Sequence, residues 1–122
     1  MEIIQQAQKL NFKLIITTDH GTINVKNPSK VIGDKNTSLN LRYKTGRSLT
    51  YEDRDVYAVR EPKLIGLPTI NMSSSYIFAK NDNFLAYVNN YNHYASYYRN
   101  TYQHGGISLE EMIVPFLLFQ PR

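Results

Sequence analysis

The sequence predicts a mixed α/β domain, and three segments of the chain support that prediction. Residues 2–10 carry apolar side chains at helical spacing, which indicates a helix with one buried face. The apolar run at 12–18 follows directly and is expected to form a buried strand. The run at 116–119 is expected to form a last buried strand. A helix joined by a short connection to a strand is half of a βαβ unit, whose first strand would lie upstream.

The elements between these two ends are shorter. Apolar or alternating runs predict strands at 22–25, 39–44, 55–59 and 75–79. Turn-forming residues such as Asn, Pro and Gly mark 26–38 as a loop. Aromatic residues recur every three or four positions over 84–102, which predicts one helix there. The capping box Ser108-Leu109-Glu110-Glu111 predicts a short helix that ends before Pro115.

The composition limits the classes of protein to which this chain can belong. Its 122 residues suffice for one domain with one core, and 42% hydrophobic residues are typical of a globular protein. No apolar run is long enough to span a membrane, and no secretory signal is expected. Cysteine is absent, which excludes thiolate metal sites and fits a cytoplasmic location. A net charge of +4 favours anionic substrates but is too small to indicate a DNA-binding protein.

Two loops that contain histidine are the candidates for chemistry. Asp19 and His20 follow the strand predicted at 12–18, and open α/β sheets bind ligands beyond the carboxyl ends of their strands. Asp oxygen and His nitrogen are good ligands for zinc or manganese, and Gly21 allows a sharp turn. His104 lies in a second loop, before two glycines and the capped helix. The alternative is structural: Asp19 and His20 cap a turn, and His104 is a hydrogen-bonded loop residue.

The two loops together resemble a known family. The run Thr17–Gly21 and the segment His104–Pro115, with the pattern HGGxSxEExxxP, are similar to the C-terminal part of PglZ domains of the alkaline phosphatase superfamily. The run Thr37–Arg47 also resembles PglZ-bearing response regulators of the PorX type, which control type IX secretion. The resemblance covers essentially the whole chain. It implies that 1–122 form the C-terminal part of an alkaline-phosphatase-like α/β/α sandwich, as an incomplete fragment of one PglZ domain.

The resemblance also implies a site for two divalent metal ions, zinc or alternatively manganese. In this superfamily one metal is bound by an upstream Asp, a nucleophilic Thr or Ser and a late Asp-His pair, which Asp19 and His20 match. The other metal is bound by an upstream Asp and His and by a late His in an HG loop, which His104 matches. The nucleophile and the upstream ligands have no counterpart here. No catalytic residue is therefore expected in this chain, and the isolated chain is expected to be inactive.

The function that the resemblance implies is that of a metal-dependent phosphodiesterase or phosphatase in a two-component response regulator. Its substrates would be phosphate esters such as cyclic or linear oligonucleotides, and its parent protein would carry an N-terminal receiver domain. The basic residues Arg42, Lys44 and Arg47 are either a clamp on substrate phosphate or a solvated strand face. The tyrosines of 84–102 either stack on bases or pack in a core or an interface.

Two other functional classes remain open. A non-catalytic signalling or dimerisation module would keep the fold and use its tyrosine-rich surface to bind a protein partner. A small basic nucleic-acid-binding domain would bind random oligonucleotides in a salt-dependent way without added metal. If the chain is a fragment of a larger domain, its sheet exposes an unpaired edge and apolar surface, so a homo-oligomer is expected. No contact with a membrane is expected.

Overall fold

The computed structural model of the chain describes residues 2–69 and 73–121. Its helices and 3-10 turns are α1 (Glu2–Lys9), α2 (Tyr91–Tyr97), α3 (Leu109–Met112), η1 (Asp53–Asp55) and η2 (Pro62–Ile65). Its strands are β1 (Leu14–Thr17), β2 (Ile23–Val25), β3 (Asn27–Val31), β4 (Tyr43–Gly46), β5 (Val56–Val59), β6 (Ser75–Ala79), β7 (Asn83–Tyr87), β8 (Thr101–Gln103) and β9 (Phe116–Phe119). The mixture confirms the predicted α/β class. No helix in these two ranges has the length and hydropathy needed to cross a bilayer.

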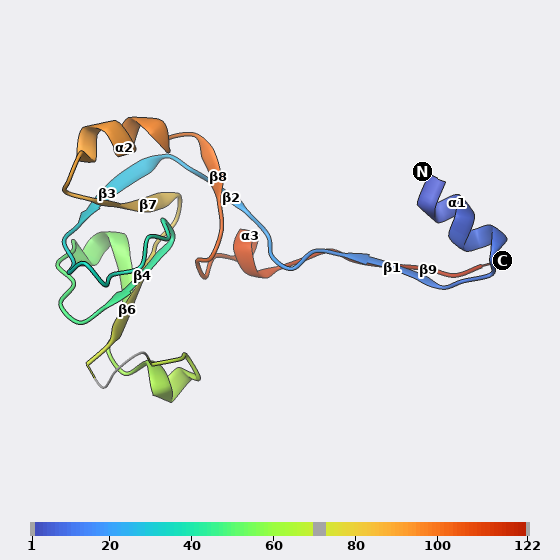
Figure 1. Cartoon of the computed structure of the whole chain (residues 1–122), viewed down its shortest axis with the longest axis horizontal. Helices are drawn as coiled ribbons and strands as arrows, with labels where there is room; N and C mark the ends of the chain where they lie inside the picture. The colour runs from blue at the N-terminus through green and yellow to red at the C-terminus, as the bar shows by residue number, and fades with distance from the viewer. Residues whose placement is uncertain (1, 70–72, 122) are drawn as a thin grey trace.

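The described strands form four small sheets. Three are two-stranded, with β1 antiparallel to β9, β2 antiparallel to β8, and β3 parallel to β7. The fourth is antiparallel in the order β4-β6-β5. Figure 1 shows β3, β7, β4 and β6 gathered with α2 in one compact body, while the β1–β9 ribbon extends away from it and α1 lies at the far end.

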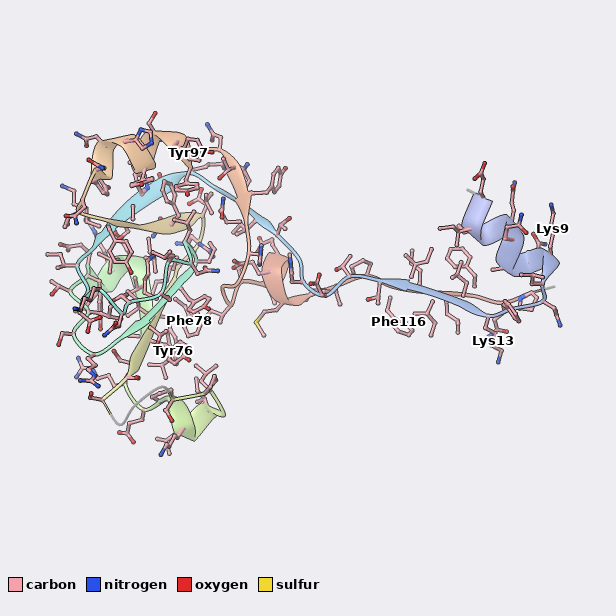
Figure 2. All side chains as sticks on the ribbon, viewed as in Figure 1. Lys9, Lys13, Tyr76, Phe78, Tyr97 and Phe116 are labelled. Carbon is pink, nitrogen blue, oxygen red and sulfur yellow. The ribbon has the colours of Figure 1, made fainter. Side chains whose placement is uncertain are left out.

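The hydrophobic core lies in the compact body, around β6 and β7. Strand β6 has four consecutive buried residues, because its two neighbours β4 and β5 leave it in the centre of its sheet. Tyr76 and Phe78 stack on one face of that strand, with ring centroids 6.0 Å apart (Figure 2). The buried side chains form three clusters: Val31, Val56, Ile77, Ala79 and Leu85; Val25, Phe84 and Ala86; Val59, Tyr76 and Phe78.

The ribbon of β1 and β9 corrects the prediction of two buried strands at 12–18 and 116–119. Both strands form and pair, with Leu14 opposite Phe119. However, β9 is exposed along its whole length, and so is β1 beyond its first residue. Phe116 keeps 67% of its surface exposed, and Figure 2 shows its side chain on the extended arm. A run of apolar residues predicts a strand but does not specify which strands cover it, so the error lies in the burial alone.

The single helix predicted at 84–102 is also wrong. Phe84 lies in β7, only Tyr91–Tyr97 are helical, and β8 follows. Asn90 and Asn100 bound the helical part, and both adopt left-handed backbone conformations, with φ of 54° and 62°. Asparagine tolerates this conformation better than most residues, so each of them breaks the path of the chain. The regular aromatic spacing came from a strand and a short helix in succession.

Strand β3 lies where the sequence predicts a loop. Asn27-Pro28-Ser29 has the composition of a turn, yet Pro28 lies in a strand opposite Phe84. A proline is tolerated there because β3 belongs to a two-stranded sheet and needs no amide donor on its open edge. The strands predicted at 22–25, 55–59 and 75–79 are confirmed, as are the helices at both ends of the chain. The strand predicted at 39–44 begins only at Tyr43.

Candidate metal centre

The two histidine loops meet at one end of the β2–β8 sheet. Asp19 and His20 lie on the turn between β1 and β2, whereas His104 follows β8 and precedes α3. Ile23 of β2 is opposite Gln103 of β8 in the antiparallel register. The pairing of these two strands therefore brings together loops that are more than eighty positions apart in the sequence.

The imidazole of His20 is held in one tautomer by its own loop. Its Nδ1 lies 2.9 Å from the carbonyl oxygen of Gly21, and a carbonyl can only accept a hydrogen bond. Nδ1 therefore carries the proton when the ring is neutral, and the lone pair is on Nε2. A hydrogen bond from the second ring nitrogen to a backbone carbonyl is the usual way in which a metal-binding histidine is oriented.

Asp19 presents an oxygen beside that free nitrogen. Its Oδ1 is 3.6 Å from Nε2 of His20, and its side chain is 90% exposed. Two ligand atoms at zinc distances of about 2.0–2.2 Å in a tetrahedral site lie about 3.4 Å from each other. The Asp19 oxygen and the His20 nitrogen are thus spaced as two ligands of one ion would be, without any change in the backbone.

His104 lies directly against His20. The two rings stack with centroids 3.8 Å apart and an interplanar angle of 12°. Metal ions in two-metal hydrolytic sites are about 3.5–4 Å apart. Two parallel imidazoles at this spacing can each bind a separate ion of such a pair, whereas their stacked geometry is unsuited to binding one ion between them.

The described residues provide only part of each site. Among residues 2–69 and 73–121, no group of three or more His, Cys, Asp and Glu side chains is arranged to hold a metal ion. Asp19 and His20 could contribute two ligand atoms to one ion, and His104 could contribute one to another. The third histidine, His93, lies on α2 and stacks near Tyr97, with centroids 6.0 Å apart.

A buried ion pair supports the loop that carries His104. Arg42 is fully buried, and its Nε and Nη2 donate to the two carboxylate oxygens of Glu111 at 2.9 and 3.0 Å. Its Nη1 donates to the carbonyl oxygen of Asn83 in β7. The planar guanidinium matches the carboxylate with two parallel hydrogen bonds, which fixes α3 against the compact body.

Glu111 also binds both histidine loops directly. Its carboxylate accepts hydrogen bonds from the amides of Gly106 at 2.9 Å and Ser108 at 3.3 Å, the latter being one half of the predicted capping box. Its backbone carbonyl accepts a hydrogen bond from the amide of Gly21 at 2.9 Å. One residue therefore holds the loop of His20 through its main chain and the loop of His104 through its side chain.

Close approach explains the glycines next to Glu111. A Cβ added to Gly21 would lie 2.0 Å from the carbonyl oxygen of Glu110, and a Cβ added to Gly106 would lie 2.4 Å from a carboxylate oxygen of Glu111. Real Cβ atoms do not come this close to other atoms. Both loops consequently need glycine in order to reach α3.

The electrostatics of Glu111 follow from these contacts. Burial by itself would raise the pKa of this carboxyl group, but the hydrogen bonds from Arg42 and Gly106 and the positive charge of Arg42 outweigh it. The net effect is a pKa below its ordinary value of 4.5. Glu111 is therefore an anion at neutral pH, and its charge is neutralised within the fold.

The second support of the His104 loop is Asn40. Its Nδ2 donates to the carbonyl oxygen of His104 at 3.4 Å, a long hydrogen bond. Its Oδ1 accepts from the amides of Arg42 at 2.7 Å and Tyr43 at 3.2 Å. Asn40 therefore joins the start of β4 to the histidine loop, although the sequence analysis assigns it no role.

The three basic residues that the sequence groups as a phosphate clamp have different environments. Arg42 and Lys44 are 0% and 1% exposed, while Arg47 is exposed. The alternative of a solvated strand face is therefore wrong for Arg42 and Lys44. Burial also counts against the clamp at these two positions, because Arg42 already binds Glu111 with two of its nitrogens.

A groove of about 800 Å³ adjoins both loops. Thr22 and Ser108, which follow the glycines of the two loops, line it together with Lys26, Lys80 and the exposed ring of Tyr102. Lys26 is 3.7 Å from Asp82 and keeps 61% of its side chain exposed. The groove thus combines two lysines with the carboxylates of Asp82 and Glu110 and the ring of Tyr102. Tyr102 is one of the tyrosines that the sequence offers for base stacking, whereas the two lysines have no role predicted from the sequence.

The sequence analysis identifies the candidate ligands but misses the residues that position them. Glu111 appears there only as a helix cap, and Arg42 only as a candidate for phosphate binding. Their pairing joins positions 69 residues apart in the sequence. The available signal is the presence of charged residues within two partly apolar segments, and one sequence does not show which of them meet.

Comparison with known proteins identifies the family. A search of curated proteins found no match. The family described as the BREX system PglZ alkaline phosphatase-like domain matches residues 2–119, which include both histidine loops and the pair of Arg42 and Glu111. Members of the alkaline phosphatase-like superfamily are generally metal-dependent and act on phosphate esters. The chain therefore belongs to the PglZ family of alkaline phosphatase-like domains.

Proposed function

We propose that this chain supplies the late metal ligands of a phosphoric ester hydrolase that acts with two zinc or manganese ions. Asp19 and His20 would bind one ion, and His104 would bind the other. Bound metals would stabilise the charge that develops on the attacking and leaving oxygens. The nucleophile and the remaining ligands would come from an upstream part of the same domain, with 1–122 as its C-terminal segment.

The observation that carries this proposal is the stacking of His20 on His104 at 3.8 Å. Two histidines from distant loops lie side by side, which supports a role for them as ligands of two neighbouring ions. The loops that carry them are held by hydrogen bonds from the amides of Gly21 and Gly106 to Glu111, which limits their movement. Ligands held in this way lose little conformational freedom when a metal binds.

The groove beside the loops supports an oligonucleotide or nucleotide ester as the substrate. Lys26 and Lys80 would attract phosphates, and Tyr102 would stack on a base. Arg47 is the remaining exposed member of the predicted clamp. Cyclic or linear oligonucleotides therefore fit the chemistry of this surface better than a small monoester without an aromatic group.

The wider setting of the proposal is a cytoplasmic two-component response regulator linked to type IX secretion. It rests on the similarity of the run Thr37–Arg47 to regulators of the PorX type. In that setting an N-terminal receiver domain would control the hydrolase. The exposed β1–β9 ribbon would then be covered by upstream strands or by a second copy of the protein in a homo-oligomer.

Zinc titration by calorimetry tests the metal ligands. The wild-type chain is expected to give a saturable heat of zinc binding. The Asp19→Asn/His20→Ala double variant is expected to give none. His93→Ala is the matched control, because it removes a histidine outside both loops and should bind zinc as the wild type does. Equal binding by the wild type and the double variant would refute the assignment, whereas no binding to the wild type would show that the upstream ligands are indispensable.

Hydrolysis provides a separate test. The isolated chain is expected to leave bis(p-nitrophenyl) phosphate intact with either metal, because a phosphoryl-transfer site needs both ions and a nucleophile. Metal-dependent hydrolysis that disappears in His20→Ala would show that the chain is complete enough to act as an enzyme.

A non-catalytic signalling or dimerisation module is the second candidate. One observation favours it: the described side chains do not form a complete site for a metal. The exposed apolar ribbon would then serve as the contact surface for a protein partner. This candidate predicts that partner binding survives the Asp19→Asn/His20→Ala substitutions.

A further inference from the structure

A second cavity lies in the compact body, between β4, β7 and α2. Its volume is about 230 Å³. Lys44 forms part of its wall together with Leu85, Tyr87, Tyr94 and Tyr98. None of the residues that line it belongs to either histidine loop, so an inference about this cavity does not depend on the proposed hydrolase.

Lys44 is the unusual member of this wall. It is 1% exposed, and its Nζ lies 4.3 Å from the centroid of the Tyr87 ring. Within residues 2–69 and 73–121, no carboxylate forms an ion pair with it. Arg42, which lies two positions earlier and directly before β4, has Glu111 as its partner. The fold thus neutralises one buried cation and leaves the other facing a cavity.

A buried ammonium without a counter-charge is unfavourable. The face of the Tyr87 ring stabilises the charge of Lys44 in part, because its electrons attract a cation. It does not supply a negative charge. Burial accordingly lowers the pKa of Lys44 from 10.5 to about 8, so that most of these side chains are still cations at pH 7.

The remaining walls of the cavity are apolar and aromatic. Tyr94 and Tyr98 stack with ring centroids 6.1 Å apart, and Tyr94 is 39% exposed, which places it near the opening. Leu85 of β7, which is fully buried, also lines the cavity. A cavity of about 150 Å³ accommodates a benzene ring, so this one has room for a ring and one small polar group.

We propose that this cavity binds a small organic carboxylate with one ring-sized or branched apolar body, whose carboxylate pairs with the ammonium of Lys44. A single ammonium balances a single negative charge, whereas a phosphate dianion would leave one charge buried without a partner. The apolar body would pack against Leu41 and the rings of Tyr94 and Tyr98. The volume excludes a nucleotide, so this ligand is distinct from the substrate proposed above.

Titration of the whole chain with benzoate and with 3-methylbutanoate, followed by amide NMR spectra, tests the proposal. Saturable shifts of the amides of Leu85, Ala86 and Tyr94 are expected for at least one of these two acids. Benzamide has the shape of benzoate without its charge. Its affinity is expected to be lower by a factor of about ten or more, because a hydrogen bond to a charged group contributes that much to binding. This comparison needs no variant.

Two variants complete the test. Lys44→Met keeps the length of the side chain and removes its charge, and it is expected to weaken benzoate binding about ten-fold or more. Lys30→Met is the matched control, because Lys30 also lies over a tyrosine ring, at 4.7 Å from the Tyr91 centroid, but is exposed. Equal affinities for benzoate and benzamide, an unchanged affinity in Lys44→Met, or no saturable shift with either acid would each overturn the proposal.

Discussion

Replacing Glu111 by glutamine tests whether the buried ion pair holds the two histidine loops in place. Each carboxylate oxygen of Glu111 accepts two hydrogen bonds. Oε1 accepts from Arg42 at 2.9 Å and from Gly106 at 2.9 Å. Oε2 accepts from Arg42 at 3.0 Å and from Ser108 at 3.3 Å. The substitution Glu111→Gln keeps the shape of the side chain, removes its charge and turns one acceptor into a donor.

The magnitude of the effect follows from these contacts. The new amide nitrogen faces two donors, one from Arg42 and one from a loop amide, and can accept from neither. The guanidinium, which is fully buried, loses its counter-charge. Removal of one partner from a buried ion pair costs about 3–5 kcal/mol, which is a large part of the 5–15 kcal/mol that stabilises a typical domain. We expect the free energy of unfolding to fall by about that amount.

Urea denaturation followed by circular dichroism measures this loss. Glu110→Gln is the control, since Glu110 lies in the same short helix but is exposed, and it should change stability by less than about 0.5 kcal/mol. The double variant Arg42→Met/Glu111→Gln should recover part of the loss, because it leaves no unpaired charge. A Glu111→Gln variant within about 1 kcal/mol of the wild type would refute the reasoning.

Four further predictions come from the same contacts and exposures. Because the pKa of Glu111 is lowered in the fold, the stability that its charge provides is present above pH 4.5 and is lost as the pH falls through the lowered value. When the free energy of unfolding is measured at decreasing pH, it should therefore fall less in Glu111→Gln than in the wild type. Because burial lowers the pKa of Lys44 to about 8, the unfolded chain binds more protons than the folded chain between pH 8 and 10.5. In urea denaturation, the free energy of unfolding of the wild type should therefore rise over this range relative to that of Lys44→Met. Gly21→Ala should lower the free energy of unfolding by about 1–3 kcal/mol through overpacking against α3, and an unchanged urea midpoint would contradict the close approach. Phe116→Ser on the exposed ribbon should reduce self-association in light scattering, and a wild-type chain that stays monomeric at high concentration would contradict the role of this surface.

The sequence predicts the elements whose signals are local. The capping box at Ser108 specifies α3 because its residues are neighbours in the chain. Strand β6 is predicted with its observed bounds, because an apolar run of that length between polar residues fits a central strand. The Asp-His pair is visible in the same way, since both candidate ligands lie in one short loop.

The features that the sequence does not predict depend on distant contacts. The exposure of β1 and β9 depends on which strands lie beside them, and their own residues contain no information about that. The roles of Arg42 and Glu111 depend on a pairing across 69 residues. The helix predicted at 84–102 is interrupted at Asn90 and Asn100, which is a local cause. Asparagine also occurs within helices, however, so its presence alone does not predict an interruption.

The double attachment of Glu111 has a kinetic consequence for the two loops. Amide protons exchange with solvent when the hydrogen bonds that protect them open. The amides of Gly21, Gly106 and Ser108 all donate to this one residue. Unfolding of α3 would expose all three at once, so their hydrogen exchange should follow a common rate. The lifetime of the assembled pair of histidines would then equal the residence time of one short helix.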